Sequence, residues 1–60
     1  MSQTEGGRLF RESWIAGVRR HFPGEPKAGY VADWDALPEW QQASDADIFE
    51  AIEAVRPLVA

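Results

Sequence analysis

The sequence predicts a mainly α fold: a two-helix antiparallel hairpin joined by an extended aromatic connector, with oligomerisation as one way to complete its core. Apolar residues recur at helical spacing in two segments, residues 8–22 and 38–56. The segment between them, residues 23–36, is interrupted by prolines and glycines and has no sustained period. Residues 1–30 carry a charge of +2 and residues 31–60 a charge of −6. Two helices of opposite charge attract each other when they pack antiparallel.

The composition is typical of a small, ordered domain. The chain has 60 residues, of which 45% are apolar, and a net charge of −4. Because it has no cysteine, it has no disulfide framework or thiolate metal site, which fits a reducing compartment. No stretch approaches the roughly 20 apolar residues of a membrane span, and the N-terminal residues lack the basic and apolar regions of a secretory signal. We therefore expect a cytoplasmic protein that binds neither membranes nor nucleic acid, since nucleic-acid binding usually leaves a basic surface.

The first helix is expected over residues 8–22, after a flexible N-terminal tail of residues 1–7 that ends in Gly6-Gly7. Its apolar face is formed at every fourth residue by Phe10, Trp14, Val18 and Phe22. Positive charge suits the C-terminal end of a helix dipole, and the last turn contains Arg19, Arg20 and His21. Pro23 then stops the helix.

The connector over residues 23–36 carries apolar side chains, so we expect it to lie against the helices. Tyr30-Val31 has the composition of a short strand, but the sequence offers no second strand to pair with it.

The second helix is expected over residues 38–56, with a proline at the first helical position and an acidic residue in the first turn. Pro57 cannot continue a helix, so the helix should end near Arg56. Ser44 resembles an N-cap and raises the possibility of a break. One continuous helix is favoured, because the apolar face keeps its phase across Ser44.

No catalytic or metal-binding motif stands out, and we expect a non-enzyme with no cofactor. His21 is the only histidine, and no nucleophile or orienting carboxylate lies at a recognisable spacing from it. The carboxylate pairs Asp33/Asp35 and Asp45/Asp47 lack the glycine and the further oxygen ligands of a calcium loop. Helix capping and solubility explain these carboxylates better.

Seven aromatic rings are more than two helices can enclose. We expect Trp14 and at least one other tryptophan in the core, and one or two rings near the surface. Exposed rings are suited to anchoring a protein partner, and the candidates are Trp34, Trp40 and Phe49.

The segment from Lys27 to Asp45 carries a recognisable order of residues. Lys27 is followed by an extended stretch, by Trp34 and two further residues, by Leu37-Pro38-Glu39, and by Asp45. This order resembles the ryanodine-receptor repeat (RyR) domain. Upstream, Ser13-Trp14-Ile15 followed by Arg19 is similar to the tryptophan-then-arginine first helix of that family.

The resemblance spans residues 14–52 and implies that residues 8–60 form one small RyR-like helical domain, used as a binding module. Stand-alone members of the family in bacteria and phages look like ligand-sensing modules, with nucleotide-derived ligands as the usual suggestion. This sequence departs from the family pattern at Arg11, where a histidine is usual. It also has a shorter link between the helices, and Ala28-Gly29 where the family has a histidine-proline pair.

Two functions remain open from the sequence. A basic cluster beside aromatic residues would suit a phosphate and a stacked base, and the residues concerned are Arg19, Arg20, Lys27, Tyr30 and Trp34. The alternative is a protein-interaction module, either an accessory subunit or a small phage- or host-encoded inhibitor, that acts through exposed aromatic residues. A homodimer is compatible with either function.

Overall fold

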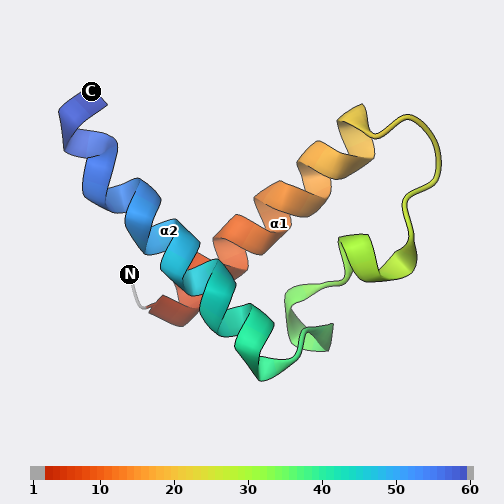
Figure 1. Cartoon of the computed structure of the whole chain (residues 1–60), viewed down its shortest axis with the longest axis horizontal. Coiled ribbons are helices and arrows are strands. Elements are labelled where there is room, and N and C mark those ends of the chain that lie inside the picture. The colour runs from red at the N-terminus through yellow and green to blue at the C-terminus, as the bar shows by residue number, and fades with distance from the viewer. Residues whose placement is uncertain (1–2, 60) are drawn as a thin grey trace.

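Two long helices joined by an irregular connector make up the chain (Figure 1). The computed structural model describes residues 3–59, with side chains for residues 4–56. Its elements are helix α1 (Gln3–His21), the short 3-10 turns η1 (Ala28–Val31) and η2 (Trp34–Ala36), and helix α2 (Glu39–Val59). Over this range there is no strand. The expected mainly α, two-helix hairpin is confirmed.

Helix α1 begins at Gln3, five residues before the start that the sequence predicts. The expected tail is wrong over residues 3–7, which are helical, while Met1 and Ser2 lie outside the described residues. The helix starts earlier because Gly6 and Gly7 are buried against other parts of the fold and belong to the packed part of α1. A Cβ atom at Gly6 would overlap the ring of Phe49, so glycine here allows close packing rather than ending the helix.

The C-terminal end of α1 agrees with the sequence to within one residue. The helix ends at His21, and Gly24 has a φ of +131°, a conformation that favours glycine. The chain therefore reverses at the proline-glycine pair, as expected.

Helix α2 is continuous through Ser44, which confirms the single-helix prediction. It begins at Glu39, and the carbonyl oxygen of Pro38 accepts hydrogen bonds from the backbone N–H groups of Gln41 and Gln42 at 3.0 and 3.1 Å. The predicted end near Arg56 is wrong, because the helix extends to Val59. Pro57 lies so near the end that it removes one backbone hydrogen bond from the last turns without interrupting a long helix.

The helices meet where the N-terminal half of α1 crosses the middle of α2 (Figure 1). The helices cross as an X (Figure 1), and at the crossing Gly6 lies against Phe49 while Arg11, further along α1, pairs with Asp45. Beyond the crossing the C-terminal halves diverge (Figure 1). The radius of gyration is 12.5 Å, against about 10 Å for a compact domain of this length. Each C-terminal half therefore keeps a face that the other helix does not cover.

The core is very small. Among the described side chains, the buried apolar ones are Trp34, at 7% exposure, and Ala46. The expectation that Trp14 belongs to the core is wrong, because its ring is exposed, and Trp34 takes that place. More rings are exposed than the one or two expected, namely Trp14, Phe22, Tyr30 and Trp40.

The chain exposes more surface than its mass requires. Its accessible surface is 4609 Å², whereas a folded monomer of 6.7 kDa is expected to expose about 3,900 Å². The excess is about 700 Å². Within residues 3–59 no helix combines the length and hydrophobicity that a bilayer crossing requires.

Candidate binding surface

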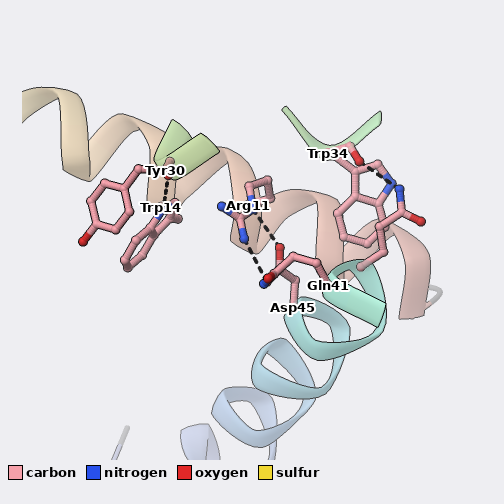
Figure 2. A network of polar contacts seen from close by, with 7 residues as sticks. Arg11, Trp14, Tyr30, Trp34, Gln41 and Asp45 are labelled. Carbon is pink, nitrogen blue, oxygen red and sulfur yellow. Dashed lines mark hydrogen bonds and ion pairs between the residues drawn. The ribbon is translucent and has the colours of Figure 1, made fainter. Parts of the chain in front are cut away.

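A buried ion pair lies at the helix crossing (Figure 2). The guanidinium of Arg11 on α1 donates two hydrogen bonds to the carboxylate of Asp45 on α2, from Nε to Oδ2 at 2.8 Å and from Nη2 to Oδ1 at 3.1 Å. The two side chains are only 8% and 1% exposed. Gln41 completes the cluster by donating from Nε2 to Oδ1 of Asp45 at 3.0 Å.

The polar atoms of this cluster are hydrogen-bonded to one another. Both carboxylate oxygens of Asp45 accept hydrogen bonds, and no buried side-chain polar atom in the described part of the chain lacks a partner. Within the same residues no group of three or more histidine, aspartate and glutamate side chains is placed to hold a metal ion. The paired charges fix how the two helices cross, because a bidentate arginine–carboxylate pair has a strict geometry.

Three aromatic rings attach the connector to α1. The indole Nε1 of Trp14 donates to the backbone carbonyl of Tyr30 at 3.0 Å (Figure 2). The rings of Trp14 and Tyr30 are 5.3 Å apart between centroids at 77°, and those of Phe22 and Tyr30 are 5.8 Å apart at 57°. Edge-to-face and tilted arrangements of this kind are favourable for aromatic pairs. Tyr30 thus lies between the ring of Trp14 on α1 and that of Phe22, the first residue after the end of α1.

An open hollow of about 320 Å³ lies between α1, the connector and α2. We call it the aromatic groove, and its apolar walls are formed by Phe10, Trp14, Tyr30, Leu37 and Ile48. Arg11, Gln41 and Asp45 also line it, so the buried ion pair forms part of its lining. A second hollow of about 500 Å³ shares Trp14 and Tyr30 with the groove and continues along α1 to Phe22. The two hollows form one apolar surface.

The second part of this surface is an exposed row of aliphatic side chains on α2. We call it the aliphatic stripe, and it consists of Ile48, Ile52 and Val55. The spacing of four and then three residues places the three side chains on one face of the helix. Ile48 also lines the aromatic groove. The stripe therefore starts at the groove and follows α2 away from the crossing.

The structure separates the residues that the sequence groups as a ligand site. Tyr30 and Lys27 line one hollow of about 250 Å³ together with Phe22. Arg19 and Arg20 are exposed in the last turn of α1.

Trp34, the proposed second stacking ring, does not lie with them. Its ring is packed against Gly7, and its backbone carbonyl accepts a hydrogen bond from Nε2 of Gln42 at 2.8 Å. The burial of its ring against the helix crossing removes it from the candidate ligand site.

The residues predicted to anchor a partner do not form one surface either. Trp40 is 69% exposed, which fits the prediction. Phe49 is half-buried against Gly6, and Trp34 is in the core. Of the predicted anchors, Trp40 is therefore the one that presents most of its ring to solvent.

Sequence reasoning missed the ion pair, although the sequence contains a signal for it. Arg11 lies three and seven residues before Trp14 and Val18, so it falls within the apolar face of the first helix. Asp45 likewise lies three and seven residues before Ile48 and Ile52. A charge of opposite sign inside the apolar stripe of each helix indicates a buried pair, because an unpaired buried charge is very costly. The exposed pair of Arg8 with Asp35, at 2.9 Å, carries no such signal.

Comparison with known proteins identifies no relative. No protein-family model, no curated protein and no solved structure matches this chain. The resemblance to the ryanodine-receptor repeat stays a prediction from the sequence.

Proposed function

We propose that this chain is a non-enzymatic protein-interaction module whose partner docks on the aromatic groove and the aliphatic stripe. The observation that carries the proposal is the amount of apolar side chain left at the surface of a folded chain of 60 residues. The exposed large apolar residues are Leu9, Trp14, Phe22, Tyr30, Trp40, Ile48, Ile52 and Val55. Contiguous exposed apolar surface marks interaction sites in soluble proteins.

The chemistry of the surface favours a protein partner. Tryptophan, tyrosine and phenylalanine at the centre of an interface contribute much of its binding energy, and Trp14 and Tyr30 are at the centre of this surface. An elongated apolar hollow with a helical stripe beside it suits the apolar face of a helix, which reaches such a surface through side chains at helical spacing.

The proposal is tested by a photoreactive benzoylphenylalanine in place of Ile52, on the aliphatic stripe. The matched control carries the same residue in place of Ala54, which is exposed two positions further along α2 and faces away from the stripe. We expect a cross-linked protein adduct from position 52 and little from position 54. Equal yields from both positions, or none from either, would refute the proposal.

A second candidate function has one specific observation in its favour. Lys27, Tyr30 and Phe22 line a common hollow of about 250 Å³, so a cation and two rings lie together as a small anionic ligand with a planar group would require. A nucleotide-derived ligand is what the ryanodine-receptor-repeat resemblance implies. Calorimetric titration with a panel of nucleotides and cyclic nucleotides tests it, with Lys27→Gln as the variant expected to lose the binding. Absence of heat at millimolar ligand would exclude it.

A further inference from the structure

The chain exposes more total surface than a compact monomer does, and the excess is close to what each partner buries in a stable interface. The chain exposes about 700 Å² more than a compact monomer of its mass, and a stable interface buries about 800 Å² on each partner. The buried apolar side chains of the described residues, Trp34 and Ala46, make a very small core. A chain of this length without disulfides gains little net stability from its own core, so a partner that is present wherever the protein is made would stabilise the fold. A second copy of the chain is the partner that meets this condition.

We propose that two copies associate as a symmetric dimer in which the aliphatic stripe of each copy packs on α1 of the other. This inference rests on the proposed function and names the partner. It places the stripe, Ile48 to Val55, on the apolar surface from Trp14 to Phe22 of the second copy. The two surfaces match in length, because at the helical rise the seven steps from Ile48 to Val55 and the eight from Trp14 to Phe22 correspond to about 10 and 12 Å.

The distribution of charge favours packing of α2 on α1 of the second copy over packing of α2 on α2. Helix α1 carries four arginines and two glutamates, a charge of +2. Helix α2 carries five acidic residues and one arginine, a charge of −4. Two α2 helices side by side would repel each other, whereas α2 of one copy on α1 of the other brings opposite charges together. A two-fold axis forms this contact twice, because each surface of one copy meets the other surface of its partner.

The unaltered protein provides the first test. Sedimentation equilibrium and thermal unfolding are measured from about 5 to about 500 µM. We expect a mass of twice 6.7 kDa and a midpoint of unfolding that rises with concentration, because dissociation accompanies unfolding. A mass of 6.7 kDa throughout, with a midpoint independent of concentration, would overturn the inference.

Two variants test whether the stripe forms the contact. Ile52→Asp places a charge in the proposed interface, and we expect the dimer to weaken by about 100-fold or more. Ala54→Asp adds the same charge on the opposite side of α2 and should leave the dimer within about threefold of the original. Equal effects of the two changes would mean that the stripe is not the contact. If Ile52→Asp fails to fold, Ile52→Ala replaces it, and the test with the unaltered protein stands without either variant.

The arrangement is tested by nuclear magnetic resonance on a mixture of two samples. One copy is unlabelled and carries a nitroxide at Ala51→Cys, an exposed position beside the stripe, and the other is ¹⁵N-labelled and unaltered. The indole N–H signal of Trp14 in the labelled copy should broaden more than that of Trp40. A diamagnetic label is the control. Stronger broadening of Trp40 in a dimer would overturn the proposed arrangement.

Photo-cross-linking from position 52 separates this inference from the proposed function. In the purified protein the expected adduct is a dimer of the chain. A monomer that gives no adduct when pure, but cross-links a different protein in a cell extract, would overturn the dimer and leave the proposed function standing. Absence of adducts in both samples would refute both.

Discussion

Replacing Arg11 by methionine tests whether the buried ion pair sets the stability of the whole fold. The change removes two hydrogen bonds to Asp45, at 2.8 and 3.1 Å, and leaves a carboxylate that is 1% exposed with Gln41 as its hydrogen-bond donor. Breaking one side of a buried pair costs about 3–5 kcal/mol. A chain of 60 residues has a total stability of about 3–9 kcal/mol, so we expect Arg11→Met to lose from about a third to all of the stability of the fold.

The double variant Arg11→Met/Asp45→Leu separates the cost of an unpaired charge from the worth of the pair. Both buried charges are then absent, and apolar replacements of similar volume are often neutral or stabilising. We expect the double variant to regain the stability of the original chain to within about 1 kcal/mol. The control is Arg8→Met, which breaks an exposed pair with Asp35 and should cost at most about 1 kcal/mol.

Urea unfolding followed by far-ultraviolet circular dichroism measures all four chains at one protein concentration, since association changes the apparent stability. A stabilising osmolyte brings the weak variant into the measurable range. If Arg11→Met unfolds no more readily than Arg8→Met, the pair does not hold the crossing together. If the double variant is as unstable as Arg11→Met, the stability of the fold depends on the hydrogen-bond geometry of the Arg11–Asp45 pair and not on the neutralisation of a buried charge.

Two further comparisons probe the crossing and the exposed rings. Gly7→Ala should destabilise the fold, because the added Cβ would lie 2.6 Å from the Trp34 ring. Gly17→Ala should stabilise the fold by about 0.4–1 kcal/mol, because its Cβ would meet nothing within 4 Å. Denaturant midpoints that shift in the same direction for both variants would contradict this. In the same measurement, Trp34→Ala should lower the free energy of unfolding by about 3–5 kcal/mol and Trp40→Ala by less than about 0.5 kcal/mol. Similar losses for the two variants would show that Trp34 is not the core residue.

The two helices and the link between them could be predicted from the sequence because each rests on a local rule. Apolar side chains at every third or fourth residue define a helix face whatever lies opposite it, and the pair Pro23-Gly24 ends a helix by its own backbone geometry. The start of α1 could not be predicted in this way. Gly6-Gly7 has the same composition whether it ends a helix or lets another segment approach it, and only the position of Phe49 decides between the two.

The candidate surface was harder to predict, because burial depends on how the helices cross. Trp14 and Trp34 have the same side chain, and nothing local says that the ring from the connector enters the crossing while the ring from the helix stays at the surface. The divergence of the helices leaves Ile52 and Val55 exposed, although both lie on the apolar face of α2. The sequence does indicate the pairing of Arg11 with Asp45, because each is a charged residue within the apolar face of its helix.

The close approach of the helices at Gly6 and Gly7 has a consequence for how this sequence tolerates variation. In a scan of all single substitutions, sensitivity is usually greatest at the largest apolar residues. Here we expect the opposite in part of the chain. Gly6 and Gly7, which have no side chain, should be among the positions least tolerant of substitution, and Trp40, which has a large ring, among the most tolerant. A chain shortened to begin at Arg8 would keep every exposed apolar anchor and lose the two residues that bring its helices together.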